Sequence, residues 1–224
     1  MVLGSSLAHG VASRAITQST VDFKQKVQAM RKKVDAVRHK RAARYRALCA
    51  GIKDVFSDNL LFFNSEGDQN GKDKKAFCNY LGFTPSDDGG LAIHFVSLRA
   101  KDLSMKAVDK MIINEHSYAR LLQTYRTKDI KEIFTHNERA DLMRLLCCWS
   151  YLDGNDRQFI TQGHALALEK GELRFCWDKK EKVIRMRTII SYDAMSPIRA
   201  DEVRNLIPTG TPYEWRSYAG ECEQ

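Results

Sequence analysis

The sequence predicts an α+β fold with a long basic helix near the N-terminus, central helices and a C-terminal antiparallel β-meander. Residues 21–56 contain no proline and a single glycine, and their apolar residues recur at helical spacing. After the turn at residues 153–156, three alternating segments follow one another with short polar joints, which is typical of antiparallel strands. With 224 residues and a hydrophobic content of 43%, the chain can bury a core without disulfides or metal.

The chain is predicted to divide into three parts. Residues 1–20 are rich in serine and alanine and carry little charge, so we expect a flexible N-terminus there. Residues 21–57 are predicted to form one basic helical arm, although its apolar stripe slips in phase near Arg41. The remaining residues, 58–224, are expected to form the α+β domain.

The positive charge is concentrated in residues 1–57. The net charge of the chain is +8, and this segment holds twelve Lys or Arg against three acids, so the rest of the chain is close to neutral. Because few carboxylates lie one helical turn away, we expect the arm to contact nucleic acid, RNA more than DNA, through its phosphates. A solvated helix, or an arm that docks its apolar stripe on a protein partner, remains the alternative. The expected binding residues are Lys32, Lys33, Arg38, Lys40, Arg41, Arg44 and Arg46.

The middle of the chain is predicted to hold one strand followed by helices. Polar, turn-rich breaks at residues 64–73 and 85–90 enclose a short apolar segment, and the alternation from residue 91 to 98 favours a strand. The helical segments expected after it are 104–111, 116–127, 129–134 and 139–152.

The meander is predicted at residues 158–169, 172–178 and 183–192, and a short helix at residues 200–206. In the third strand, strict alternation places Arg185 and Arg187 on one face and Thr188 on the other.

The distribution of cysteines and the absence of several sequence motifs argue against secreted, membrane-spanning, metal-dependent and cofactor-dependent classes of protein. The six cysteines are scattered without a C-x-x-C pair and lie mostly in apolar runs, which is typical of free thiols in a reducing, cytoplasmic compartment. No apolar run is long enough to span a membrane. Closely spaced metal ligands, Walker loops, Rossmann glycines and nucleophile elbows do not occur in the sequence, so no cofactor or metal is expected.

Histidines and arginines are the residues that could carry catalysis. Arg120 follows His116 by one helical turn, which puts both side chains on one helix face. His164 lies on the first predicted strand, and Arg187 and Thr188 lie on the third. Metal-free RNA cleavage needs a base, an acid and cations that face the phosphate, and these residue types supply them. Each residue alone is also explained as an ordinary helix-start, strand-edge or solvent-facing side chain.

Three short motifs resemble bacterial ribonuclease toxins of the barnase–EndoU–colicin–RelE type. They read His-Ser-x-Ala-Arg-Leu-Leu-Gln-x-x-Arg from His116, Gly-His-Ala-Leu-Ala-Leu from Gly163 and Ile-x-x-Arg-Thr-Ile-Ile-Ser from Ile184, and they span residues 113–192. The resemblance implies helices packed on an antiparallel sheet and an RNA substrate. The alternative is a non-catalytic protein, such as a phage or bacterial regulator, that binds nucleic acid or host machinery through the basic helix. The metal-free site implied by the resemblance lies near His116, Arg120, His164, Arg187 and Thr188.

Overall fold

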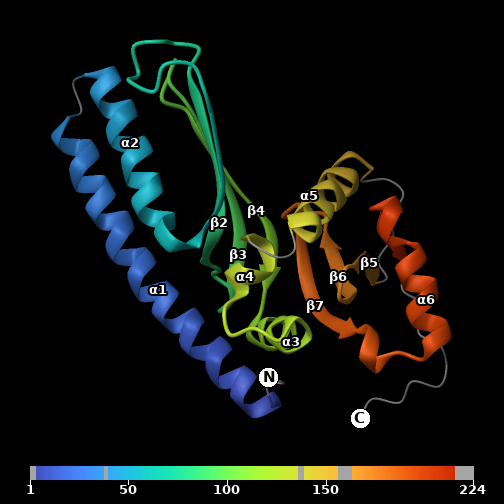
Figure 1. Cartoon of the computed structure of the whole chain (residues 1–224). Helices are drawn as coiled ribbons and strands as arrows, with labels where there is room; N and C mark the ends of the chain where they lie inside the picture. The colour runs from blue at the N-terminus through green and yellow to red at the C-terminus, as the bar shows by residue number, and fades with distance from the viewer. Residues whose placement is uncertain (1–3, 38–39, 136–138, 156–162, 215–224) are drawn as a thin grey trace. The chain divides into compact units, whose positions relative to one another are not determined.

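A computed structural model describes residues 4–37, 40–135, 139–155 and 163–214. It confirms the α+β fold, with a long N-terminal helix and C-terminal strands (Figure 1). The chain divides into two compact units, one formed by residues 12–115 and the other by residues 1–11 together with 116–224.

The N-terminal region forms two helices where the sequence predicts a flexible segment and one long arm. The first helix, α1 (Ser5–Ala36), begins sixteen residues before the predicted arm, and its buried side chains include Ala8 and Ala12. Alanines at this spacing form a narrow apolar stripe, which composition alone does not distinguish from a flexible segment. The phase slip near Arg41 marks the start of the second helix, α2 (Arg41–Phe56).

In the unit of residues 12–115, α2 lies alongside α1 (Figure 1). A Cβ atom on Gly51 of α2 would lie 2.2 Å from Cγ of Met30 on α1, so glycine is needed for this close approach. Lys33 of α1 and Asp54 of α2 form an ion pair at 3.0 Å.

The same unit contains an antiparallel sheet in the order β1-β2-β3-β4. The predicted helix at residues 104–111 is wrong, because this segment is the strand that pairs with β3 along its length. Pairing across the hairpin outweighs the local helix preference of its methionine, lysine and alanine. The strands are β1 (Leu60–Glu66), β2 (Phe77–Pro85), β3 (Leu91–Arg99) and β4 (Met105–Ile113).

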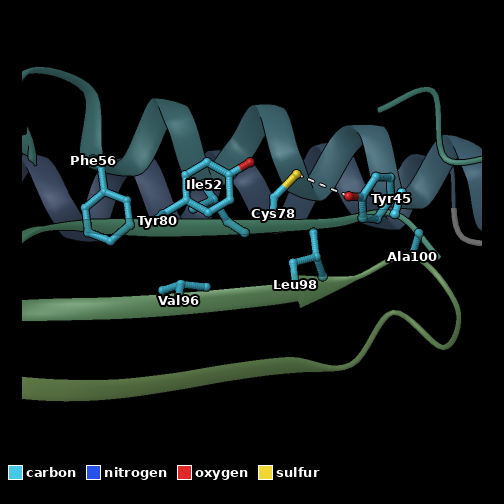
Figure 2. Packing of buried hydrophobic residues seen from close by; sticks show 9 residues of the cluster. Tyr45, Ile52, Phe56, Cys78, Tyr80, Val96, Leu98 and Ala100 are labelled. Atoms are coloured by element: carbon cyan, nitrogen blue, oxygen red, sulfur yellow. Dashed lines mark hydrogen bonds between the residues drawn. The ribbon is translucent and has the colours of Figure 1, made fainter. Parts of the chain in front are cut away.

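Helix α2 packs on one face of β2 and β3. The fully buried rings of Tyr45, Phe56 and Tyr80 share a core with Cys78 and Leu98 (Figure 2). The hydroxyl of Tyr45 lies 3.1 Å from Sγ of Cys78. Since side chains alternate along a strand, the neighbours of these residues in β2 and β3 lie on the opposite face of the sheet.

The second unit contains the predicted meander. β5 (His164–Leu168), β6 (Gly171–Asp178) and β7 (Val183–Ser191) pair antiparallel in sequence order, and β8 (Tyr213–Glu214) adds to the free edge of β5. The predicted start of the first strand, at residue 158, lies outside the described residues. The last helix begins at Pro197, earlier than predicted, because Oγ of Ser196 caps it by accepting from the backbone N–H of Arg199.

The helices of the second unit agree with the segments predicted at 116–127, 129–134 and 139–152 to within a few residues. No helix among the described residues is long and apolar enough to cross a membrane. The elements are α3 (Glu115–Tyr125), α4 (Ile130–Thr135), α5 (Arg139–Gly154), β5 (His164–Leu168), β6 (Gly171–Asp178), β7 (Val183–Ser191), α6 (Pro197–Asn205) and β8 (Tyr213–Glu214).

Gly82 of β2 provides a test of the packing between α2 and the sheet. A Cβ atom there would lie 2.4 Å from Cδ1 of Phe56 and 2.7 Å from the carbonyl oxygen of Asn59. We expect Gly82→Ala to lower the free energy of unfolding by about 1–3 kcal/mol through overpacking, measured by chemical denaturation. Gly10→Ala, in the open interior of α1, is the matched control and is expected to raise it by about 0.5–1 kcal/mol. Equal effects of the two substitutions would contradict this packing.

Candidate functional site

Two arginines of α2 are engaged by loops of their own unit. Arg41 donates through Nη1 to the carbonyl oxygen of Ala100 and through Nη2 to that of Lys72. Arg46 donates through Nη1 to the carbonyl oxygen of Asn70 at 2.8 Å. Both arginines are among the residues expected to bind nucleic acid, and in the structure they hold the loops that precede β2 and follow β3.

The remaining predicted binding residues differ in their surroundings. Lys33 is paired with Asp54, although both side chains are largely exposed. Arg38 lies outside the described residues. Exposed side chains that remain available to a ligand are Lys32, Lys40 and Arg44.

A basic groove of about 340 Å³ lies on the sheet of residues 12–115. Four of its lining side chains are cationic, one is aromatic, two are neutral and polar, and none is a carboxylate. None of the residues that line it is among those predicted from the sequence. The basic groove is lined by Lys74, Lys75, Ala76, Phe77, Asn79, Ser97, Arg99 and Lys101.

The register of β2 and β3 builds this groove. Phe77 pairs with Arg99, and Asn79 pairs with Ser97. Cys78, between Phe77 and Asn79, faces the core under α2. Because strand side chains alternate, the two cross-strand pairs lie on the sheet face opposite α2.

Carboxylates of the adjoining loops are directed to backbone groups. Oδ1 of Asp73 accepts from the backbone N–H of Lys75 at 2.8 Å, and Oδ1 of Asp102 accepts from that of Ser104 at 2.9 Å. Hydrogen bonds from the side chain and backbone of Ser104 also lower the pKa of the Asp102 carboxyl. These turns fix the loops without placing a carboxylate in the groove lining.

The groove could have been found from the sequence by a local count of charge. Residues 72–75 read Lys-Asp-Lys-Lys, and residues 99–101 read Arg-Ala-Lys. When charge is summed over residues 58–224, the many acids elsewhere cancel these cations. The pairing of Phe77 with Arg99 can be predicted only when β2 and β3 are both recognised as strands. The sequence predicts only β3 as a strand.

In the second unit, His116 lies beside His9, a residue to which the sequence assigns no role. The ring centroids of His116 and His9 are 5.7 Å apart and the rings are tilted by 39°. Partial burial lowers the pKa of His116, and the nearby charges of Arg120 and His9 lower it further. A histidine with a lowered pKa is neutral at pH 7 and can accept a proton.

Arg120 and Thr188 line one groove between α3 and β7, with a volume of about 530 Å³. Arg126 also lines it and pairs with Asp193 at 3.1 Å. Oγ of Ser117 holds α3 against β7 by donating to the carbonyl oxygens of Met186 and Arg187, at 3.0 and 2.8 Å. The structure thus brings together two of the five predicted catalytic residues in this groove, with His116 one turn along α3.

His164 is directed away from this groove. It pairs with Phe175 of β6, whereas Thr188 pairs with the preceding residue, Arg174. Adjacent residues of a strand face opposite sides, so His164 and Thr188 lie on opposite faces of the sheet. The His164 side chain is buried and its ring lies 5.6 Å from that of Phe175. The structure therefore does not bring His164 together with Thr188.

A β-bulge changes the expected pattern of β7. The register skips Arg187, because Thr188 pairs with Arg174 and Met186 pairs with Phe175. Beyond the skip, Arg185 pairs with Cys176, which is on the same face of β6 as Arg174. Thr188 therefore shares a face with Arg185, where strict alternation predicts the opposite. Arg187 is exposed and occupies the extra position.

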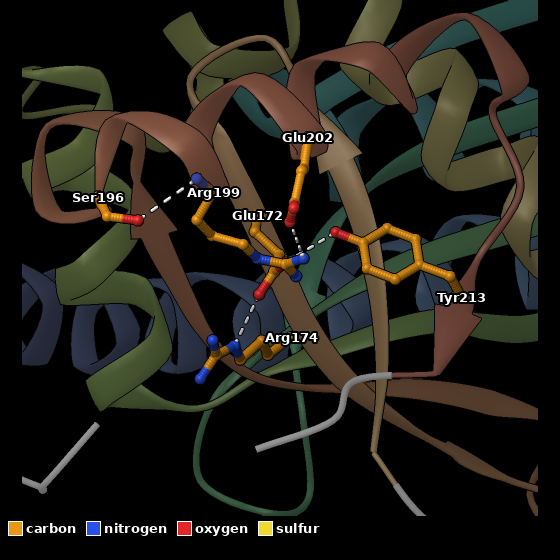
Figure 3. Close-up of polar contacts among 6 residues, drawn as sticks. All are labelled: Glu172, Arg174, Ser196, Arg199, Glu202 and Tyr213. Carbon is orange, nitrogen blue, oxygen red and sulfur yellow. Dashed lines mark hydrogen bonds and ion pairs between the residues drawn. The ribbon is translucent and has the colours of Figure 1, made fainter. Parts of the chain in front are cut away.

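The most deeply buried carboxylate of β6 belongs to an ion-pair network. Glu172 is fully buried and accepts from Arg174 at 2.8 Å, Arg199 at 2.5 Å and the hydroxyl of Tyr213 at 2.8 Å (Figure 3). Burial opposes the charge of Arg199, but the Glu172 carboxylate raises the pKa of Arg199 overall. Burial raises the pKa of Tyr213, so its hydroxyl remains a donor. The network joins α6 and β8 to β6 and leaves the carboxylate no access to solvent.

Within the described residues, no group of three or more His, Cys, Asp or Glu side chains is placed to hold a metal ion. Comparisons with protein-family models, with curated proteins and with solved structures gave no match for this chain. Function must therefore be inferred from the two grooves themselves.

Arg41 and Arg44 allow the two kinds of arginine in α2 to be compared. Arg41→Ala removes the donors to Ala100 and Lys72 and should lower the free energy of unfolding by about 2 kcal/mol. Arg44 is exposed, so Arg44→Ala should change it by less than about 0.5 kcal/mol. Urea denaturation measures both, and a larger loss for Arg44→Ala would contradict the assignment.

Proposed function

We propose that the unit of residues 12–115 binds nucleic acid through the basic groove. The observation that supports this function is the cationic lining, in which Lys74, Lys75, Arg99 and Lys101 surround a concave surface without a carboxylate. Such a surface attracts phosphates and gains affinity when their counterions are released.

Helix α2 adds to the same cationic end of the unit. Lys40, the residue just before the helix, and Arg44, in its first turn, are both exposed. Arg41, between them, reaches the carbonyl oxygens of Lys72 and Ala100, which lie within two residues of groove residues in the sequence. The basic helix predicted from the sequence thus supports the site chiefly by fixing the two loops, and its exposed cations extend the positive field around them.

The number of cations predicts the salt dependence of binding. Four phosphate contacts to a single strand give a slope of log K against log salt of about −3. We expect Lys74→Glu combined with Lys75→Glu to weaken binding and to make this slope shallower, as measured by fluorescence anisotropy between about 50 and 200 mM salt.

Lys180→Glu, an exposed change in the other unit, is the control for charge reversal and should leave the slope unchanged. Affinity that does not depend on salt, or equal losses for the groove and control variants, would rule out the proposed binding site.

Metal-independent RNA cleavage is a second candidate function, supported by the contact between His9 and His116 and by Arg120 one turn along. One imidazole would take the proton of a 2′-hydroxyl, and that oxygen would attack phosphorus as the bond to the 5′-oxygen breaks. The other, protonated imidazole would give its proton to the leaving oxygen. The products are a 2′,3′-cyclic phosphate and a 5′-hydroxyl, and Arg120 would stabilise the charge on phosphorus.

This second function predicts RNA cleavage in excess EDTA. His116→Ala and His9→Ala should each lower the rate about 10²- to 10⁴-fold, while His94→Asn, in the other unit, should not change it. Because the pKa of His116 is lowered, the rate governed by this base should fall only below the ordinary histidine value of 6.5. Intact RNA with the wild-type protein, or equal rates for all variants, would exclude cleavage and leave the binding proposal standing.

A further inference from the structure

The basic groove contains an aromatic ring among its cations. Phe77 is half-buried and lines the groove together with Arg99, its cross-strand partner. Because Phe77 is only half-buried and lines the groove, part of it can contact a ligand. The next pair along the strands, Asn79 and Ser97, adds an amide and a hydroxyl that can bond to the edge of a base.

A second aromatic position lies further along the same face. Phe62 of β1 and Phe95 of β3 both pair with Leu81, which shares a face with Phe77. Phe62 is 51% exposed, and Nζ of Lys110 lies 5.4 Å from the centre of the Phe95 ring. Leu81 lies four positions after Phe77, which is about 13 Å along the strand. The two aromatic positions would therefore meet different bases.

The shape of the groove favours an unpaired strand. In a duplex the bases are stacked on one another, and proteins read them with a helix or ribbon that protrudes into a groove of the nucleic acid about 12 Å wide. This protein has a concave surface of about 340 Å³ with the ring in its lining. A base can reach that ring only if it is free of its own stack, whereas phosphates of either form can reach the lysines.

We infer that the basic groove binds single-stranded nucleic acid with one base stacked on Phe77 and the flanking phosphates held by Lys74, Lys75, Arg99 and Lys101. This inference rests on the proposed function and adds the form of nucleic acid that the site accepts. Asn79 and Ser97 contact the edge of the stacked or the following base, and the strand continues toward Phe62 and Phe95.

The test measures binding of four labelled ligands of equal length by fluorescence anisotropy with the full chain. The ligands are an unstructured single-stranded RNA, a DNA strand of the same sequence, the corresponding duplex, and an abasic strand that keeps only the sugar and phosphate. The wild-type protein should bind one or both single strands at least about 10-fold more tightly than the duplex and the abasic strand.

Phe77→Leu should weaken binding of the single strand about 5- to 150-fold, the loss of one base stack, and should leave binding of the abasic strand unchanged. The abasic strand therefore also reports whether the variant is folded. Phe77→Tyr, which keeps an aromatic ring, should restore binding to near the wild-type level.

Equal affinity for the single and abasic strands, tighter binding of the duplex, or an unaffected Phe77→Leu variant would each overturn the inference while leaving the proposed function intact. Failure of the wild-type protein to bind any of the four ligands would overturn both.

Discussion

The burial of one face of β2 and β3 beneath α2 is the constraint on which the basic groove depends. The helix contributes the large side chains of Tyr45, Ile52 and Phe56 to this core. The strands contribute Tyr80 and Leu98. Because side chains alternate along a strand, the neighbours of these core residues in β2 and β3 must lie on the opposite face of the sheet. A register slip of one residue would turn Phe77, Asn79 and their cross-strand partners toward the core and expose Tyr80 and Leu98. The hydrophobic packing therefore specifies a surface that is itself polar.

The loops that carry the groove's cations are fixed by hydrogen bonds to backbone groups. Asp73 and Asp102 fix the turns by accepting from backbone N–H groups, and Arg41 reaches the loop carbonyls from α2. These bonds hold the loops in place without neutralising the lysines. Repulsion among the lysines remains, and a bound anion would relieve it. This relief of repulsion adds to the affinity of the groove for anions. The contribution becomes smaller as salt screens the charges.

The sequence was sufficient to predict structure wherever a local period was long and uninterrupted. The meander at β6 and β7 and the helix α3 follow such patterns, and their bounds agree with the prediction to within a few residues. In the other unit the sequence predicts only β3, because β4 resembles a helix and β2 is a short apolar segment between two turns that contains Gly82. Phe56 explains this glycine, since its ring occupies the space of a Cβ atom. Local sequence patterns do not reveal this contact. They also do not reveal the bulge that places Thr188 on the face of Arg185.

The same distinction applies to function. A charge count along the chain identified α2 as the cationic element, yet the guanidinium groups of Arg41 and Arg46 are held by carbonyl oxygens of nearby loops. The groove takes its cations from the loop before β2 and from the end of β3 with the loop that follows it, and these segments are adjacent because β2 pairs with β3. Likewise, His116 finds its neighbour in His9, more than a hundred residues away, whereas His164 faces the opposite side of its sheet from Thr188. Residue type indicates which chemistry is available, but strand register and helix contacts decide which residues can perform it together.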